Sequence, residues 1–446
     1  MTNTDFPTFT GPVLRAGEDG YDAEIAGFQT AYTHRPAVVV GAAHAEDVRA
    51  AVEYAARHGL PIGVQATGHG LSVALDGGVL ISTRRMTDIG VDPAARTARV
   101  AAGVRSGALV EAAAAHGLAP RSGSSPSVGV IGYHLGGGLG ILARTFGYAA
   151  DHVRAIELVT ADGRLRRLVP GDELFGAVLG SGGNFGVVTA LELELIPLTT
   201  VYGGRLVFDT ALAESALEVW RRWTRTVPEE MTSAITLMTM PDVPVIPEPL
   251  RGRYIATINI AHTGPAEEGE RLVEPLRRIG EPLADELREM PYAESHAIYR
   301  DPDFPHAYTA TNVLLSELNA DAARAFLDVT GPDVPVAVVA GFRHLGGALR
   351  RAGAATIDHR DAEYIARFIT EPGEGAVRAQ HELIAKTLSP WTVGHNLNFL
   401  YGAGEWADED QTRAGYTQHT YARLAALKSK YDPANLFRAN RNIQGK

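Results

Sequence analysis

The chain has 446 residues, of which 45% are hydrophobic and 21% charged, and its formal net charge is −11. This length exceeds what one hydrophobic core serves and favours two or three domains of a folded protein. The acidic balance, without a run of Lys or Arg, argues against nucleic acid as a partner. The absence of cysteine excludes disulfides, thiolate metal sites and a thiol nucleophile, and we expect no metal.

The N-terminus and the hydropathy pattern predict the compartment. Residues 1–10 are polar and lack the basic-then-apolar pattern of a secretory signal. No run of about 18 apolar residues occurs, so we expect neither a membrane span nor a membrane partner. These features predict a cytoplasmic protein, and they leave the oligomeric state open.

Strands and helices are predicted to alternate over the first 200 residues. Apolar residues at helical spacing predict two helices, at 45–58 and 106–116, each closed by a glycine. Short apolar or alternating runs predict strands at 37–40, 61–65, 78–82 and 96–101. This rhythm favours an α/β arrangement.

A hairpin is predicted next, over 153–169, because Asp162-Gly163 supplies the backbone angles that its turn needs. A short helix at 173–179 and a long alternating strand at 185–196 complete this part, and Pro197 ends the pattern. Beyond about residue 200 glycine-rich loops become rare. Helices (212–226, 266–279, 322–329, 376–387) then alternate with strands such as 254–261 and 335–341.

Three glycine-rich stretches carry the strongest signal, because glycine lets the backbone approach a ligand closely. They are Gln65-Ala66-Thr67-Gly68-His69-Gly70, the stretch from Ser122 to Gly140, and the stretch from Gly182 to Thr189. A fourth signature runs from Tyr431-Asp432-Pro433 to Asn440-Arg441-Asn442-Ile443. In this order the four stretches resemble the berberine bridge enzyme-like oxidases of the vanillyl-alcohol oxidase flavoprotein superfamily.

The resemblance implies an α+β fold with three parts. A PCMH-type FAD-binding domain of two α/β subdomains would occupy residues 1–199. A substrate-binding domain with an antiparallel sheet flanked by helices would occupy 200–405. The segment 406–446 would return to the FAD domain.

The resemblance also implies that His69 carries FAD covalently at the 8α-methyl carbon, where a neutral imidazole nitrogen can attack. Serines of the second stretch would hold the pyrophosphate, its glycines would lie flat against the cofactor, and Val188 would present backbone to the adenine. The residues that the resemblance places at FAD, besides His69, are Gln65, Ala66, Thr67, Gly68, Gly70, Ser124, Ser125, Ser127, Val128, Gly129, Gly132, Gly137, Gly138, Gly140, Asp151, Gly186, Val188, Asn398, Asn440 and Asn442.

The chain departs from the family pattern at three places. The usual Arg-Ser-Gly-Gly-His-Ser is replaced around His69, which puts local phosphate contacts in question. Many relatives bind the flavin a second time through a cysteine, which would fall at Ser125, so we expect a single linkage. The family's Asn-Tyr, whose tyrosine is the catalytic base, is Asn398-Phe399 here.

The base must therefore lie elsewhere or be unnecessary. Tyr401, His134 and His344 are the candidates, and each has a packed or exposed alternative role. Tyr401 would face the same side as Phe399 if this segment were a strand. The segments 342–348 and 355–360 are expected to form strands over the flavin, with His359 and Arg360 either structural or catalytic.

The implied reaction transfers a hydride from a C–H bond of a small molecule, a bulky secondary metabolite, to FAD. Dioxygen would then reoxidise the flavin and give hydrogen peroxide. The alternatives are a carbohydrate or alcohol oxidase of the same family, a flavin-binding protein without turnover, and a sugar-binding module.

Overall fold

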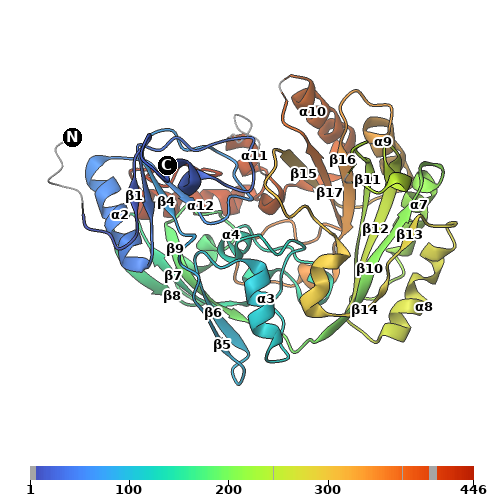
Figure 1. The fold of residues 1–446 in the computed structure, drawn as a ribbon, viewed down its shortest axis with the longest axis horizontal. Helices are drawn as coiled ribbons and strands as arrows, with labels where there is room; N and C mark the ends of the chain where they lie inside the picture. Colours follow the sequence, from blue (N-terminus) through green and yellow to red (C-terminus); the bar gives the residue numbers. More distant parts are fainter. Residues whose placement is uncertain (1–6, 245, 374, 401–408, 446) are drawn as a thin grey trace.

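The computed structural model describes residues 7–244, 246–373, 375–400 and 409–445. Figure 1 shows two lobes side by side. The first domain is built on two sheets whose strands lie between Val13 and Glu194, and the second domain on one large sheet whose strands lie between Thr200 and Gly394. The mixture of helices, a short parallel sheet and two antiparallel sheets is an α+β fold. In the part of the chain that is described, no helix has the length and apolarity needed to cross a membrane.

The first sheet has the order β1-β2-β4-β3, in which β2, β4 and β3 are parallel and β1 is antiparallel to β2. Helix α2 links β2 to β3 and ends as the sequence predicts, because Gly59 adopts φ 63° at its C-terminus. The elements of this sheet and its helices are β1 (Val13–Leu14), α1 (Tyr21–Ile25), β2 (Val38–Gly41), α2 (Ala45–His58), β3 (Ile62–Gln65) and β4 (Val79–Ser82).

The second sheet is antiparallel throughout, with the order β5-β6-β9-β7-β8. The predicted hairpin is confirmed as β7 and β8. Four α-helices of the described chain connect its strands. The elements are β5 (Ile89–Asp92), β6 (Thr97–Ala101), α3 (Ser106–Ala114), α4 (Val130–Leu135), α5 (Ala143–Phe146), β7 (Val153–Val159), β8 (Leu165–Leu168), α6 (Phe175–Val178) and β9 (Val187–Glu194). This sheet corrects the expectation of an α/β rhythm over the whole first domain.

The third sheet has nine strands in the order β13-β10-β12-β11-β16-β17-β15-β18, with β14 also paired to β10. Its strands are β10 (Thr200–Phe208), β11 (Met231–Thr239), β12 (Tyr254–His262), β13 (Ala284–Asp285), β14 (Arg288–Pro291), β15 (Thr309–Leu315), β16 (Val339–His344), β17 (Tyr364–Thr370) and β18 (Thr392–Gly394). The helices that follow or join them are α7 (Thr210–Trp223), α8 (Ala266–Arg277), α9 (Ala320–Thr330) and α10 (Ala376–Leu388).

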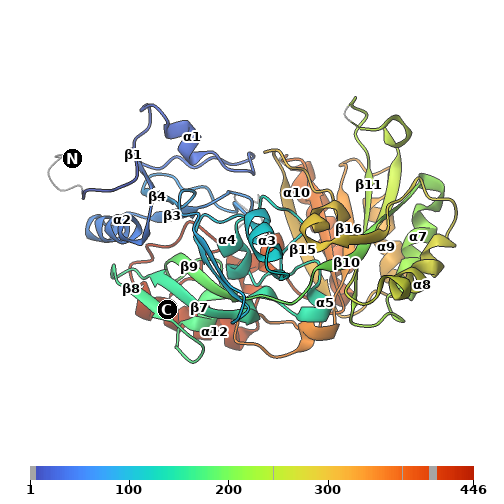
Figure 2. The same cartoon turned by 60° about the horizontal axis from the view of Figure 1, so that its bottom comes forward.

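The two faces of the third sheet have different neighbours because strand side chains alternate between faces. Phe342 and Phe368 point to one face and pack in a core with Trp220 of α7 and Phe326 of α9. Ile365 points to the opposite face and packs with Leu139 and other residues of the first domain. Figure 2 shows α7 and α8 on the side of the sheet away from the first domain. The second domain therefore turns one sheet face toward the first domain.

The C-terminal helices are α11 (Glu409–Arg413) and α12 (Gln418–Tyr431). Leu424, Phe437 and Ile443 are buried in the same core as the first two sheets. The ammonium of Lys428, which is fully buried, donates to the Asp432 carboxylate (2.8 Å), to the Asn184 carbonyl (2.8 Å) and to the Phe437 carbonyl (3.0 Å). These bonds fasten the residues after α12 to the loop that precedes β9.

Three predicted segments of the second domain differ from the structure. The strand predicted at 335–341 begins only at Val339. Residues 355–360 form no strand, since they pack as a loop against α6, where the amide of Thr356 donates to the carbonyls of Gly176 and Leu179. Residues Leu397–Phe399 form one turn of 3₁₀ helix, η6, and not a strand.

Candidate functional site

A cavity of about 480 Å³ lies where the two domains meet. The first domain contributes the loops around His69, Ser125 and Gly183, and α4. The second domain contributes the loop that contains Asp301 and Tyr308, the arginines Arg343 and Arg367, and the turn η6. Residues 437–441 close the cavity from the C-terminal side. All three glycine-rich stretches and the C-terminal signature therefore meet at one place.

His69 lies on the cavity wall in the loop after β3, half-buried. Its Nε2 is 2.8 Å from the Ser127 hydroxyl oxygen. The ring of Phe28 stacks on the imidazole at 3.7 Å with an interplanar angle of 13°. Burial, together with the nearby Arg105 and His306, lowers the pKa of His69 to about 4. The imidazole is thus neutral near pH 7, which is the state of a nucleophile.

The loop that carries His69 is fixed by the residues before α2. The amides of Phe28 and Gln29 donate to the carbonyls of Thr67 and Gly68, at 2.9 and 3.1 Å. Gly68 has φ +72°, and a Cβ there would lie 2.6 Å from the Cα of Gly27, so no larger residue fits. Its neighbours Ala66 and Gly70 also line the cavity.

Gln65 lines the cavity as well, but its amide nitrogen donates to the carbonyls of Ile25 and Ala26 at 3.0 and 3.3 Å. This side chain fastens the loop to α1. The arginine that relatives usually have in this motif is thus replaced here by a glutamine whose side chain bonds to the protein's own backbone.

The second glycine-rich stretch brings its serines beside His69. The Ser127 hydroxyl lies between His69 and the Ser125 hydroxyl, which is 3.0 Å away from it. Ser124 donates to the Asp301 carboxylate of the second domain. The amide of Gly129 donates to Thr67 Oγ1 at 3.2 Å, which joins the first and second stretches. Val128 and Gly129 line the cavity too.

The glycines of this stretch separate into two groups. Gly132 lines the cavity, and a Cβ there would meet nothing within 4 Å. Gly137, Gly138 and Gly140 do not line it, and their contact with the cofactor stays a prediction. A Cβ at Gly138 would lie 2.7 Å from Ala149 Cβ and 3.0 Å from the Tyr133 ring. A Cβ at Gly140 would lie 2.6 Å from the Ser122 carbonyl oxygen and 2.8 Å from the Tyr133 hydroxyl, so close packing within the protein requires both glycines.

The third stretch and the C-terminal signature are joined by Asn184. Its amide nitrogen donates to the Arg441 carbonyl at 2.9 Å, and its oxygen accepts from the Ile443 amide at 2.8 Å. Gly186 and Val188 line the cavity. Asn440 also lines it, donates to the Gly183 carbonyl at 3.2 Å, and has a buried Oδ1 for which the described residues offer no partner. Asn442 is placed outside the cavity lining.

Asp151 is another predicted cofactor ligand that lies elsewhere. Its carboxylate forms a two-bond ion pair with the Arg360 guanidinium, at 2.7 and 2.9 Å, and accepts from the Ala355 amide at 3.2 Å. The pair connects the first domain to the second. Arg360 is thereby placed as a structural residue, and Asp151 as its partner.

Two of the three candidate bases lie outside the cavity lining. His134 is on the buried side of α4, and its Nδ1 is 2.7 Å from the Val130 carbonyl of its own helix. His344 accepts from Arg144 Nη1 at 2.9 Å and stacks with Tyr364 at 5.6 Å. Burial lowers the pKa of both histidines, that of His134 to about 4. Tyr401 lies outside the described residues.

The turn η6 places Asn398 and Phe399 on the cavity wall. The Asn398 amide fits α4 and the loop after it when its oxygen accepts from the Gly138 amide (2.7 Å) and its nitrogen donates to the Tyr133 carbonyl (3.2 Å). A Cβ at Gly136 would lie 1.8 Å from the side-chain amide of Asn398, so that glycine is required for this approach. Asn398 therefore connects the turn to the first domain.

Several lining residues were not predicted from the sequence. Phe28 stacks on His69, and the Tyr308 hydroxyl donates to the His69 carbonyl at 2.7 Å. Arg343 and Arg367 line the second domain's side and lie over the Phe399 ring, at 5.1 and 4.2 Å from its centroid. Of these four residues, only Arg343 lies in a segment that the sequence singles out, 342–348. Only their positions in the folded chain bring them to the cavity.

The arrangement fits a flavin dinucleotide. The amides of Thr67, Gly68, His69 and Gly70 donate to no other described residue, and successive backbone N–H groups of this kind bind the oxygens of a pyrophosphate. A Cβ at Gly182 or Gly183 would meet nothing within 4 Å, so these cavity-lining glycines leave space for a bound group. The unpartnered Oδ1 of Asn440 is available to accept a hydrogen bond from the bound dinucleotide.

Comparisons with known proteins agree with this fit. Residues 36–169 match the family model described as FAD binding domain, and residues 406–444 match the model described as berberine and berberine like. An FAD-linked oxidoreductase of Dictyostelium discoideum is 27% identical over 459 residues, which cover 100% of this chain and 97% of that protein.

The (R)-6-hydroxynicotine oxidase of Paenarthrobacter nicotinovorans is 29% identical, with coverage of 97% of this chain and 96% of that protein. The crystal structure of 6-hydroxy-D-nicotine oxidase from Arthrobacter nicotinovorans superposes with a TM-score of 0.84 at 28% identity and covers 100% of both chains.

Proposed function

Because the chain belongs to the berberine bridge enzyme-like FAD-linked oxidoreductases and binds FAD, we propose that it is an oxidase whose flavin is bonded covalently to His69. Dioxygen is the proposed electron acceptor, and a small organic molecule is the substrate. One observation carries the proposal. A neutral, half-buried imidazole lies on the wall of the cavity that all four sequence signatures surround.

Bound FAD would supply the redox chemistry by accepting a hydride from a substrate C–H bond and passing its electrons to dioxygen. The protein would supply position and shelter. Thr67 to Gly70 would hold the pyrophosphate through their backbone amides. Phe28 and Tyr308 would keep water and bulk solvent away from the His69 side of the cavity, because both cover it.

Ser127 would set the proton position on His69. A hydroxyl that accepts a hydrogen bond from Nε2–H leaves the lone pair on Nδ1, which is then the nucleophilic nitrogen. Ser125, next in the hydrogen-bonded row, has no thiol, so the proposal includes only one covalent bond. Phe399 accepts no proton, and we assign no base to His134 or His344, which lie outside the cavity lining.

Mass spectrometry of the denatured protein tests the linkage. The wild-type chain should carry the added mass of one FAD, and His69→Ala should carry none. His116→Ala is the matched control, because His116 is exposed on the loop after α3 and should leave the added mass unchanged. An unmodified wild-type chain would contradict the linkage, and flavin still attached in His69→Ala would contradict the single bond.

A peroxide-release screen tests the oxidase. The purified protein should be yellow, bleach with substrate in the absence of dioxygen, and release hydrogen peroxide when dioxygen returns. A yellow protein that no candidate substrate bleaches would indicate a flavin-binding protein without turnover. Bleaching without peroxide on reoxidation would indicate a different electron acceptor.

A further inference from the structure

Arg343 and Arg367 lie on one face of the third sheet. Strands β16 and β17 are antiparallel neighbours in which Arg343 pairs with Ile365 and Gly341 pairs with Arg367. Residues paired across two strands point to the same side, and so do residues two apart on one strand. Arg343, Ile365 and Arg367 therefore share the face that is turned toward the first domain.

Both guanidinium groups reach the cavity and lie over the same ring. The carbon at the centre of each guanidinium is 5.1 Å (Arg343) and 4.2 Å (Arg367) from the Phe399 centroid, and that of Arg343 is also 4.9 Å from the Tyr299 centroid. A cation–π contact uses the face of a guanidinium, whereas its N–H groups point outward at the edge. The ring of Phe399 thus contacts two cations at the cavity wall.

The charged side chains among the described lining residues are mostly cationic, although the chain has a net charge of −11. They are Arg343, Arg367, Arg441 and Asp301. Arg343 and Arg367 come from the third sheet, whereas Asp301 accepts from Ser124 at the edge of the second stretch.

We propose that this side binds a carboxylate, so that the substrate is an apolar molecule that carries an acid group. This inference rests on the proposed function, since it concerns the substrate of the same cavity. A guanidinium donates two parallel hydrogen bonds to a carboxylate. Ile369, Leu397 and Leu400 line the cavity on the same side and supply apolar surface for the rest of the substrate.

The cofactor's pyrophosphate is the competing anion. The backbone amides of Thr67 to Gly70 belong to the first domain, whereas both arginines belong to the second domain's sheet. The two anion sites are thus on different walls. The proposal predicts that changing the arginines alters acid binding and leaves FAD content unchanged.

Titration calorimetry with three probes of similar size tests the proposal on the FAD-loaded protein. Benzoate should bind about tenfold or more tightly than benzamide, and benzyltrimethylammonium should bind weakest, because hydrogen bonds between charged groups exceed those of neutral ones. Arg343→Gln and Arg367→Gln should each weaken benzoate binding about 10- to 100-fold and leave benzamide unchanged. Arg367→Lys, which keeps the charge, should retain most of the preference for benzoate.

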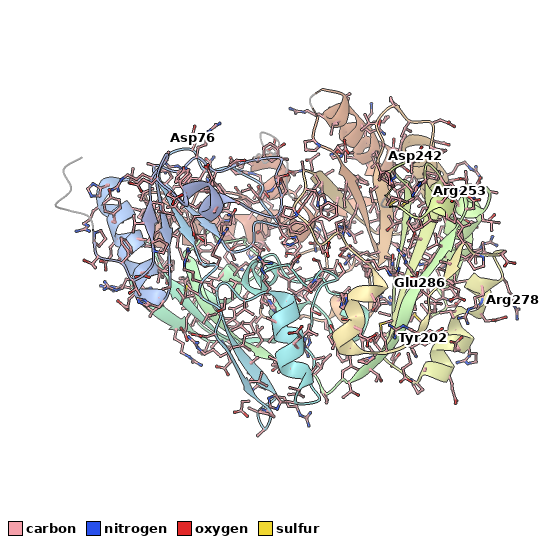
Figure 3. The ribbon with its side chains drawn as sticks, in the orientation of Figure 1. Asp76, Tyr202, Asp242, Arg253, Arg278 and Glu286 are labelled. Atoms are coloured by element: carbon pink, nitrogen blue, oxygen red, sulfur yellow. The ribbon has the colours of Figure 1, made fainter. Side chains whose placement is uncertain are left out.

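Arg253→Gln is the matched control. Arg253 pairs with Asp209 at 2.6 Å on the outer side of the second domain, where Figure 3 labels it, far from the cavity lining. The Arg253→Gln variant should bind benzoate as the wild type does. Melting temperature and FAD absorbance are recorded for every variant, so that a misfolded variant is recognised. If the glutamine variants misfold, benzoate binding by Arg367→Lys tests the proposal.

Benzoate that fails to bind, or binds no better than benzamide, overturns the proposal. Loss of FAD together with loss of benzoate binding in the glutamine variants also overturns the proposal, since the arginines would then serve the cofactor. These outcomes are separate from the test of the linkage, because calorimetry reports acid binding whether or not the flavin is covalent.

Discussion

The two walls of the cavity present different chemical groups. The first domain's wall is largely backbone, with glycines at Gly68, Gly132 and Gly183 and one neutral histidine. The second domain's wall is made of side chains on a sheet face and a turn, among them Arg343 and Phe399. A wall of backbone suits a constant ligand, whereas a wall of side chains can change with the substrate at little cost to the fold.

The walls also differ in how they are held. The first domain's wall depends on distant residues, since Lys428 and Asn184 fasten the C-terminal segment to the loop before β9. The second domain's wall depends on the regular pairing of β16 and β17. Three changes test this difference.

Lys428→Met should have the largest effect. Lys428 and Asp432 are both fully buried, and removal of one partner leaves the other charge without compensation. We expect a loss of about 3–5 kcal/mol in the free energy of unfolding, together with loss of FAD, because Asn440 lies on the segment that Lys428 holds. Urea denaturation and flavin absorbance measure both.

Lys430→Met is the control for this change. Lys430 is exposed and pairs with Glu173 on the surface, so its loss should change stability little. If Lys428→Met were as stable as Lys430→Met, the buried pair would not hold the wall.

Acid should weaken the first domain through its buried histidines. The pKa of His134 is lowered to about 4 by burial, from an ordinary value of 6.5. Between these values the unfolded chain binds a proton that the folded chain does not, so the stability present above pH 6.5 is lost as the pH falls toward 4. His34 and His69, each with a pKa of about 4, act in the same direction, as does His381 of the second domain.

His134→Phe should remove its share of this pH dependence, up to about 3 kcal/mol at pH 4. The measurement is the free energy of unfolding from urea titrations at pH 7, 5.5 and 4. His116→Phe, at an exposed position, should keep the wild-type slope. An unchanged slope in His134→Phe would show that His134 titrates alike in the folded and unfolded chains and would return it to the candidates for the base.

Ser127→Ala should have the smallest effect. It removes the hydroxyl 2.8 Å from His69 Nε2 and leaves the imidazole free to carry its proton on either nitrogen. We expect FAD to remain bound and the covalent bond to form about tenfold more slowly, as for the loss of a partner that orients a reactive histidine. Apoprotein mixed with FAD, sampled over time by mass spectrometry, gives the rate, and Ser127→Thr should restore it. Equal rates in wild type and Ser127→Ala would remove this role from Ser127.

The sequence predicted the first domain's wall well. Gly68 is recognisable because its backbone approaches Gly27 closely, and Gly132 because it leaves open space in the cavity. Such needs leave fixed patterns in the sequence. The FAD cofactor and the α+β fold followed from these patterns. Gly138 and Gly140, which close packing within the protein requires, and Asp151, which pairs with Arg360, stay predictions as cofactor residues. A glycine or an aspartate in a matched motif does not reveal whether a ligand or the protein itself needs it.

The second domain's wall was not predictable from local pattern. Arg343 and Arg367 are separated by a loop and a strand boundary, and only the register of β16 and β17 brings them to one face. Phe28 lies far from His69 in the sequence and reaches it through the bonds between residues 28–29 and 67–68. His134 and His344 were considered as bases because the sequence gives no local signal that His134 bonds within its own helix or that His344 packs against Arg144.

The C-terminal segment has a consequence for how the protein is made. The cavity wall includes both Phe28 and Asn440, which are translated far apart in time. The two sheets of the first domain are complete once Glu194 has emerged from the ribosome, and domains fold in that order as they emerge. The wall itself remains open until residue 440 follows. Capture of FAD is therefore a late event, because Leu424, Phe437 and Ile443, which complete the core of the first domain, are translated only after the second domain.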